Sequence, residues 1–253
     1  MTLLSVRDVS KRFGGLQAVS GLSFDVGQGS IKALIGPNGA GKTTLFNLVS
    51  GMLDPDSGEI FFRGEAVQEL SSHEIAARGL VRTFQHIRLF PKMTALENIM
   101  VGRHLHSRAG FIAGMLNLPF TWKEERRIRE RSLEIMELLG IADNAEAEAT
   151  SLSYGQQRVV EIGRALACEP QLLMLDEPAA GLNMRETNEM GELIAKIRDM
   201  GITVLLVEHD MSLVMKISDE IVVLSYGQKI AEDRPLSIQR NTEVIRVYLG
   251  DEQ

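Results

Sequence analysis

Short apolar runs bounded by turn-forming residues predict strands in the first third of the chain, over residues 3–9, 21–26, 31–35 and 60–62. The third run passes directly into a glycine, and apolar residues at helical spacing follow over residues 42–52. The opening third therefore combines several strands with one helix that starts at a glycine-rich turn.

Strands and helices alternate again in the last third. We expect strands over residues 172–175, 202–207 and 220–224, and helices over residues 185–200 and 212–217. The strands are almost continuous runs of Val, Ile and Leu, which is the pattern of strands covered on both faces. We therefore predict an α/β fold with a mostly parallel sheet.

The middle of the chain has a different pattern. Residues 95–140 contain no β-rich run, and residues 123–139 are strongly charged with apolar residues at helical spacing. We expect a helical subdomain over residues 91–159, inserted into an α/β core that comprises residues 1–90 and 160–253.

Composition narrows the class of protein. The 253 residues suffice for one large α/β domain or two small ones, and an apolar fraction of 44% is ample for a buried core. The net charge of -7 argues against nucleic acid as the main partner, because phosphate backbones are bound by clustered Lys and Arg. The single cysteine, Cys168, excludes a disulfide within the chain, which fits a reducing cytosol.

No apolar segment of the sequence is long enough to cross a membrane. Crossing takes roughly 20 consecutive apolar residues, whereas the nearest candidate, residues 109–120, is shorter and is interrupted by Gly114, Asn117 and Pro119. The first residues lack a basic leader followed by a long apolar run, so we expect no signal peptide. Any role at a membrane is expected to depend on partner proteins.

Residues 36–43 match the phosphate-binding pattern G-x-x-x-x-G-K-[ST], with a strand before it and a helix after it. Gly39 and Gly41 let the backbone approach phosphate closely, Lys42 would neutralise the terminal phosphates, and the Thr43 hydroxyl can ligate Mg²⁺. A glycine-rich turn that contains a lysine by chance is the alternative. The candidate nucleotide-binding residues here are Gly36, Pro37, Asn38, Gly39, Ala40, Gly41, Lys42, Thr43 and Thr44.

Two carboxylates follow the strand predicted at residues 172–175, at the sheet edge where open parallel sheets bind ligands. Adjacent strand residues point to opposite faces, so the two should differ in role. Asp176 would hold Mg²⁺ directly or through water, and Glu177 would orient and polarise the attacking water. Taken alone, the pair suits a solvated loop start equally well, and only the upstream phosphate loop favours catalysis.

His209 follows the strand at residues 202–207 and should reach the same edge. A histidine in such a position is more often structural or exposed. Beside a nucleotide it becomes a candidate for contact with the γ-phosphate. These features together predict a nucleotide hydrolase and leave its biological setting open.

The sequence LSYGQQR at residues 152–158 narrows that setting, and it begins a helix with apolar residues at helical spacing. Ser153 with Gln156 three residues later forms a capping box, which is common at ordinary helix starts. The segment also closely resembles the signature sequence of ABC ATPases, including its place just before the acidic strand. Both interpretations can hold, because a capped helix N-terminus also binds phosphate. In that family Ser153, Gly155 and Gln156 would act on the nucleotide of the partner subunit.

The resemblance to ABC ATPases covers essentially the whole chain. It implies a P-loop, RecA-like core with N-terminal antiparallel strands and an inserted helical subdomain, together one nucleotide-binding domain. Gln85 stands where the family glutamine joins core and helical subdomain and senses Mg²⁺ and the γ-phosphate. Phe13 stands where the family carries an aromatic that stacks on adenine, although a hydrophobe at a strand end explains it almost equally well.

Three differences from the usual ABC ATPase sequence indicate which branch of the family this chain resembles. Tyr154 replaces the first glycine of the usual signature pair, and residues 103–123 form a longer stretch than in many members. Asn183 stands where an aspartate is commoner in the D-loop, and it could also cap a helix with Glu186. Together these features resemble the G-type ATPases of branched-chain amino acid importers. The lipopolysaccharide-export ATPases are the nearest alternative.

The resemblance implies a set of partners as well as a site. Two ATPase subunits, self-associated or paired with a sister subunit, would enclose ATP and Mg²⁺. Their closure would drive integral membrane permease subunits at the cytoplasmic face of the inner membrane, and a substrate-binding protein would act indirectly. The implied site combines Lys42, Glu177 and His209 for catalysis with Thr43, Gln85 and Asp176 for the metal.

Two rival classes of protein fit less well. A non-transport ABC ATPase of DNA repair or ribosome function usually carries long coiled coils or two ATPase domains, and this sequence has neither. A stand-alone P-loop phosphotransferase leaves the signature helix unexplained. The apolar residues of the long stretch either contact membrane subunits or pack internally; they are Phe111, Ile112, Met115, Leu116, Phe120 and Trp122.

Overall fold

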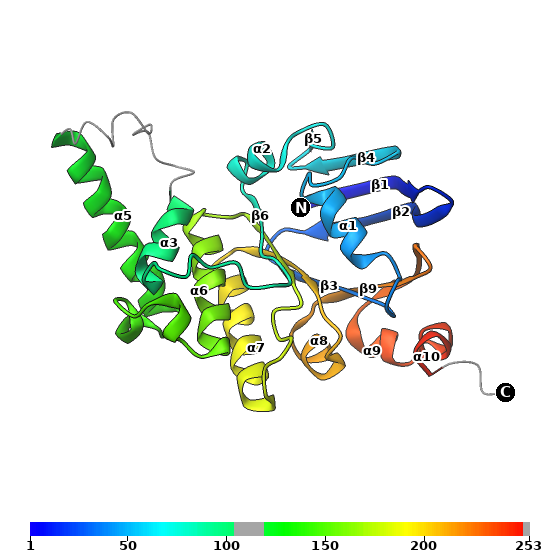
Figure 1. The fold of residues 1–253 in the computed structure, drawn as a ribbon. Coiled ribbons are helices and arrows are strands. Elements are labelled where there is room, and N and C mark those ends of the chain that lie inside the picture. The colour runs from blue at the N-terminus through cyan, green and yellow to red at the C-terminus, as the bar shows by residue number, and fades with distance from the viewer. Residues whose placement is uncertain (104–118, 250–253) are drawn as a thin grey trace. The chain divides into compact units, whose positions relative to one another are not determined.

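The computed structural model describes residues 1–103 and 119–249 (Figure 1). The chain divides into two compact units, Met1–Arg82 with Gln171–Gln253, and Thr83–Pro170. The boundaries expected from the sequence, after residues 90 and 159, both fall inside the second unit, because a cut at 159 would split one continuous helix. Within the described ranges, no helix is both long and apolar enough to span a membrane.

The first unit contains a six-stranded sheet in the order β10-β9-β3-β8-β7-β6. Every neighbouring pair is parallel except β9 and β10 at one edge. Every residue of β3, β7 and β8 is buried, which confirms the strands expected to be covered on both faces. The strands are β3 (Ile31–Ile35), β6 (Leu80–Arg82), β7 (Leu172–Asp176), β8 (Thr203–Val207), β9 (Glu220–Ser225) and β10 (Gln228–Asp233).

A second sheet of the same unit is antiparallel, in the order β2-β1-β4-β5, which confirms the expected N-terminal strands. Its first two strands run well beyond the apolar runs that predicted them, because their pairing continues, with several register shifts, through polar residues at their ends. The strands are β1 (Thr2–Phe13), β2 (Leu16–Gly27), β4 (Ser57–Phe62) and β5 (Glu65–Ala66).

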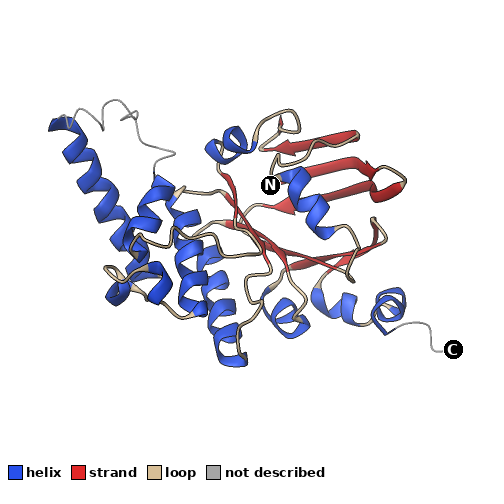
Figure 2. Cartoon of the chain, viewed as in Figure 1, coloured by secondary structure: helices blue, strands red, loops and turns tan. Residues whose placement is uncertain are grey.

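Both faces of the six-stranded sheet are covered (Figure 2). On one face, side chains such as Leu34 and Leu205 pack with the antiparallel sheet and with Leu45 and Phe46 of helix α1 (Lys42–Val49). The other face packs against three short helices of the C-terminal region. Those helices are α8 (Met211–Ile217), α9 (Pro235–Gln239) and α10 (Thr242–Leu249); α2 (Ser72–Ala77) and α7 (Met184–Asp199) complete the unit.

The second unit is helical, as the sequence predicted. Among its described residues the helices are α3 (Ala95–Arg103), α5 (Pro119–Leu138) and α6 (Tyr154–Ala167), with short 3₁₀ turns at Ala142–Asn144 and Ala149–Ser151. Helix α3 packs so closely against α6 that only glycine fits at position 102, because a Cβ there would overlap the carbonyl oxygen of Arg164. Most of the long stretch 103–123, with Phe111, Ile112, Met115 and Leu116, lies outside the described residues, and so do the side chains of Phe120 and Trp122.

Cys168 ends α6 as a buried thiol. Burial raises the pKa of Cys168 to about 11. Since the thiolate is the nucleophile, its fraction at pH 8 should be about a hundredfold lower than that of an ordinary thiol. We expect the folded protein to react slowly with an aromatic disulfide reagent at pH 8, and the urea-unfolded chain to react at the rate of a free cysteine. Rapid reaction of the folded protein would contradict this burial.

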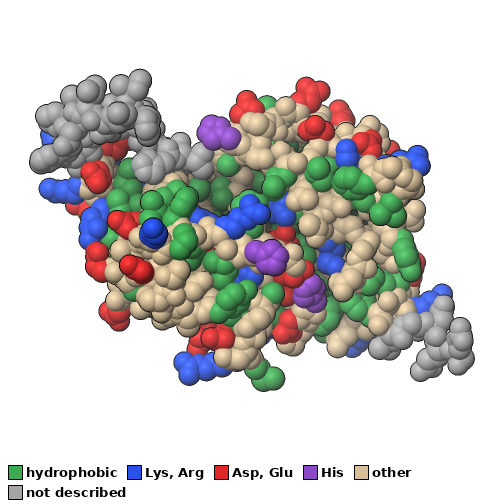
Figure 3. Space-filling view, viewed as in Figure 1, with side chains coloured by type: hydrophobic (Ala, Val, Ile, Leu, Met, Phe, Trp, Pro, Cys, Tyr) green, Lys and Arg blue, Asp and Glu red, His purple; other side chains and the backbone are tan. Residues whose placement is uncertain are grey.

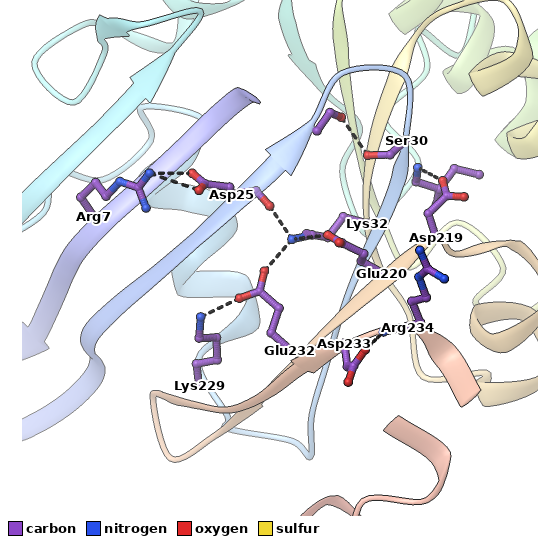
Figure 4. Close-up of polar contacts among 12 residues, drawn as sticks. Arg7, Asp25, Ser30, Lys32, Asp219, Glu220, Lys229, Glu232, Asp233 and Arg234 are labelled. Carbon is purple, nitrogen blue, oxygen red and sulfur yellow. Dashed lines mark hydrogen bonds and ion pairs between the residues drawn. The ribbon is translucent and has the colours of Figure 1, made fainter. Parts of the chain in front are cut away.

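A network of ion pairs joins the two sheets of the first unit (Figure 4). Lys32 on β3 is only 2% exposed, and its ammonium group contacts Glu220 of β9 at 2.9 Å and Glu232 of β10 at 2.6 Å. It also donates to the carbonyl oxygen of Asp25 on β2. Burial raises the pKa of Glu232, but hydrogen bonds from Lys229 and Lys32 outweigh burial and leave that pKa below its usual value.

Replacing Lys32 by Met should therefore destabilise the protein. The variant leaves two carboxylates without their central cation, but Glu220 is 55% exposed and Glu232 25%, so water can solvate them in part. We expect a loss of about 2 kcal/mol in the free energy of unfolding, below the cost of breaking a fully buried pair. Urea unfolding at pH 7 measures it.

The matched control for this prediction is Lys229→Met, which removes the more exposed cation on Glu232 and should cost less than about 1 kcal/mol. The lowered pKa of Glu232 adds a pH test. Stability from this pairing is present above the unfolded carboxyl pKa and is lost as pH falls through the folded pKa. The difference between the wild type and Lys32→Met should shrink below about pH 4, and a constant difference would contradict the pairing.

Candidate nucleotide-binding site

The predicted phosphate-binding loop lies between β3 and α1. A Cβ at Gly36 would overlap the carbonyl oxygen of Leu224, and one at Gly41 would overlap that of Ala18, so close packing requires glycine at both positions. The turn between β9 and β10 braces the loop, since Gly227 N donates to Ala40 O at 3.0 Å. No side chain caps the start of α1, so its first-turn N–H groups remain suited to an anion.

Lys42 is a buried residue in the first turn of α1. Its ammonium group donates to Gly36 O at 2.6 Å and to Pro37 O at 3.0 Å, which holds it against the start of the loop. Burial lowers the pKa of Lys42, and the negative charges of Glu177 and Asp176 oppose this shift. The loop therefore binds the Lys42 ammonium by hydrogen bonds, and the two acids predicted from the sequence stabilise its positive charge.

The two acids do not occupy successive strand positions. Strand β7 ends at Asp176, and Glu177 has left-handed backbone with φ 50°. The expected reason for their different directions, alternation along one strand, is therefore wrong. The left-handed turn re-aims Glu177, at a strain of about 1–3 kcal/mol for a residue with a Cβ. Strain of this kind persists only where surrounding contacts enforce it.

His209 does reach the edge predicted for it. Its Nε2 lies 2.8 Å from Glu177 Oε2, so the two predicted catalytic side chains are in direct contact. The imidazole is about half exposed, whereas the glutamate is largely buried. A histidine that holds a carboxylate in place while facing solvent can also contact a ligand bound at that edge.

Two further buried charges belong to this region and were not predicted from the sequence. Glu208 accepts hydrogen bonds from Ala179 N at 2.7 Å and His209 N at 3.0 Å, and so joins the segments that follow β7 and β8. Burial raises the pKa of Glu208 despite these bonds. Arg82 contacts Asp176 Oδ2 at 2.8 Å. A charged residue next to an apolar strand was the signal available in each case.

The remaining predicted site residues of the first unit lie at the start of α1 and at the end of β1. Thr43 is exposed in the first turn of α1, and Thr44 follows it half-buried. Phe13 ends β1 and is about half exposed, and the Lys11 ammonium lies 5.9 Å from the centroid of its ring. An exposed ring at a strand end is compatible with both interpretations of Phe13.

The signature segment lies in the second unit. Ser153 caps α6: its Oγ accepts from Gln156 N at 3.3 Å, and Gln156 Oε1 accepts from Ser153 N at 3.0 Å. The predicted capping box is thus confirmed. Asn183 likewise caps α7, with Glu186 completing a second box.

A buried arginine connects the signature helix to the segment that carries Gln85. Arg158 of α6 donates to Phe84 O at 3.1 Å and to Gln85 O. The same guanidinium donates to the Tyr154 hydroxyl at 3.1 Å. Tyr154, the departure from the usual signature pair, therefore has a structural role within this unit.

The site elements include a phosphate loop, an acidic strand end and a capped signature helix, and one family model spans all three. Residues 19–180 match the model described as ABC transporter. The chain belongs to the ABC transporter family. A second model, described as branched-chain amino acid ATP-binding cassette transporter, matches residues 228–253.

Relatives in the ABC family resemble this chain along its whole length. It is 46% identical to the high-affinity branched-chain amino acid transport ATP-binding protein BraF of Pseudomonas aeruginosa, over 98% of each chain. It is 45% identical to LivG of Escherichia coli, again over 98% of each. Among solved structures, the ADP conformation of an ABC transporter cassette matches with a TM-score of 0.87 and 32% identity, over 99% of this chain and 100% of that one.

As an ABC ATPase, the chain has a site that fits Mg²⁺ carried by a nucleotide. Mg²⁺ prefers oxygen ligands and is usually held by one or two carboxylates together with substrate phosphates. The Asp176 carboxylate and the Thr43 hydroxyl supply such oxygens near the phosphate loop. In the described part of the chain, no group of three His, Cys, Asp or Glu side chains is placed to hold a metal by itself.

Proposed function

We propose that this chain is the ATP-hydrolysing subunit of an importer for branched-chain amino acids. The observation that carries the proposal is similarity to BraF and LivG over 98% of the chain, together with the C-terminal match at residues 228–253. Family membership alone would leave the cargo open, because the nucleotide site is common to ABC ATPases. The C-terminal match favours the importer over a lipopolysaccharide-export ATPase.

Five side chains of the first unit would carry out hydrolysis. The loop amides and Lys42 would bind the phosphates, and Glu177 would polarise the attacking water. His209 would hold Glu177 through the 2.8 Å contact and touch the γ-phosphate. Mg²⁺, held by Asp176 and Thr43, would neutralise charge on the phosphates. Phe13 would stack on adenine, and Gln85 would contact the metal and γ-phosphate.

Each complete site would need a second ATPase subunit, either the same chain or a sister subunit. Ser153, Gly155 and Gln156 of one subunit would then face the nucleotide held by the other. The capped start of α6 supports this, since its N-terminal amides and dipole suit an anion. A dimeric bacterial cassette also matches this fold with a TM-score of 0.78 and 25% identity, over 92% of this chain.

Outside the ATPase pair, the partners would be integral membrane permease subunits, with a substrate-binding protein acting indirectly. The chain would lie on the cytoplasmic face of the inner membrane. The names of the relatives support this arrangement. Nucleic acid is not among the proposed partners; acidic and basic side chains are interspersed on the face in Figure 3.

Reconstitution tests the proposal. The chain would be co-expressed with permease and sister ATPase subunits of a branched-chain amino acid importer and placed in liposomes with internal ATP and Mg²⁺. Uptake of labelled leucine, supplied with the binding protein, should exceed uptake with Lys42→Met by at least tenfold. Lys216→Met, at an exposed position of α8, serves as the matched control and should transport normally. Assembly without leucine, isoleucine or valine uptake would overturn the cargo assignment.

A further inference from the structure

Arg82 ends β6 at the edge of the six-stranded sheet and reaches along the neighbouring strand to Asp176. Its backbone is in register with Met174 of β7, two residues before the aspartate. Two residues of strand span about 6.6 Å, which an arginine side chain can bridge. The Nη2–Oδ2 distance is 2.8 Å, with the side chains 7% and 3% exposed. The contact is a buried ion pair on one oxygen of the carboxylate.

The other end of the guanidinium fork holds helix α1. Nη1 of Arg82 donates to Asn47 Oδ1 at 2.6 Å and to Ser50 Oγ at 3.1 Å. Its guanidinium also lies 5.4 Å from the centroid of the Phe46 ring. One side chain therefore connects the helix that begins with Lys42 to the acidic end of β7.

The ion pair of Arg82 with Asp176 also has a purely structural explanation. A buried carboxylate usually needs a counter-charge, and Arg82 would supply one even if it had no relation to a nucleotide. A counter-charge alone would not require one nitrogen of the guanidinium to bond to α1 while the other bonds to Asp176. It also predicts that loss of Arg82 would weaken the fold and leave the response to metal unchanged.

We propose that Arg82 is a positioning residue for the Asp176 carboxylate. It binds Oδ2, fixes the direction of the carboxyl group relative to α1, and leaves the second oxygen for Mg²⁺ or its water. This inference rests on the proposed metal role of Asp176. Hydrogen-bond partners of metal-binding groups commonly change metal affinity by 10–100-fold when they are removed.

A cation beside Asp176 can act on Mg²⁺ binding in two opposite directions: positioning of the carboxylate strengthens binding, and charge repulsion weakens it. A cation beside Asp176 repels Mg²⁺ and occupies one oxygen, so its removal could tighten metal binding. Positioning outweighs repulsion if the carboxylate, once released from Arg82, turns away from the direction that the metal needs. The sign of the change in Mg²⁺ dependence therefore decides between the two roles.

The experiment measures binding of a fluorescent ATP analogue to the full chain, with EDTA and over a Mg²⁺ titration. Arg82→Met should bind the analogue in EDTA within about threefold of the wild type, since the loop and Lys42 are intact. Its Mg²⁺ half-saturation should rise at least tenfold. Arg82→Lys keeps a charge but lacks the fork, so we expect an intermediate value. Arg78→Met, at an exposed arginine earlier in the same segment, should match the wild type.

Three outcomes would overturn the role. They are an unchanged Mg²⁺ half-saturation in Arg82→Met, a lower one, and an equal loss of binding with and without Mg²⁺. If Arg82→Met does not fold, as judged by circular dichroism, Asn47→Ala weakens the anchor on α1 and should raise the half-saturation two- to fivefold. Failure of the wild type to bind the analogue would instead refute the proposed function, so the two failures are distinct.

Discussion

Glu177→Gln should lower the turnover of ATP by about a hundred- to ten-thousandfold, the range that a general base contributes. The variant keeps the size of the side chain and an oxygen that can accept from His209, which lies 2.8 Å away. It removes the negative charge that would polarise water. Binding of ATP should remain within about threefold of the wild type, because the phosphate loop is unchanged. Phosphate release and equilibrium binding measure the two quantities.

The same variant should accumulate an ATP-bound dimer, since closure no longer leads to hydrolysis. Light scattering after size exclusion, with and without ATP and Mg²⁺, would show it. Glu192→Gln, at an exposed position of α7, is the matched control and should hydrolyse ATP normally. Near-normal turnover in Glu177→Gln would remove this glutamate from the catalytic role.

Lys42→Met should abolish most nucleotide binding while the protein remains folded. A charge-assisted hydrogen bond to phosphate contributes about 1.5–3 kcal/mol, so affinity for ATP should fall roughly 10–100-fold. Burial already lowers the pKa of this lysine, which means that the fold bears a cost for its charge. An apolar residue of similar length should therefore be nearly neutral for stability.

Isothermal titration with ATP measures the loss, and thermal unfolding without nucleotide measures the stability. Lys216→Met again serves as the matched control, since it removes an exposed positive charge from the same unit. ATP should raise the melting temperature of the control and have little effect on Lys42→Met. Equal ATP affinities in the two variants would show that the loop does not bind the triphosphate.

Together the two variants separate binding from chemistry. Glu177→Gln should bind ATP without hydrolysing it, and Lys42→Met should fail to bind ATP. If both lost binding equally, Glu177 would be part of the phosphate cradle and its proposed work on water would be wrong. The contact of Glu177 with His209 and its charge effect on Lys42 make that comparison necessary.

Local patterns were sufficient to predict much of the fold. Strand β3 was predicted at its observed bounds, because its apolar run is buried along its entire length. Both capping boxes were also predictable, since Ser153 with Gln156 and Asn183 with Glu186 depend only on residues three positions apart. Small elements such as β6 and α10 were missed, because short segments acquire their structure from the sheet they pack on.

The sequence by itself determined the class of fold, the phosphate loop and the identity of the acids and histidine at the sheet edge. It could do so because each depends on spacing within a few residues. Only the tertiary structure decided that Glu177 turns out of β7 to meet His209, and that Arg82 joins Asp176 to α1. Those contacts link residues 32 and 94 positions apart. Such pairings depend on strand order and register, and no local pattern encodes them.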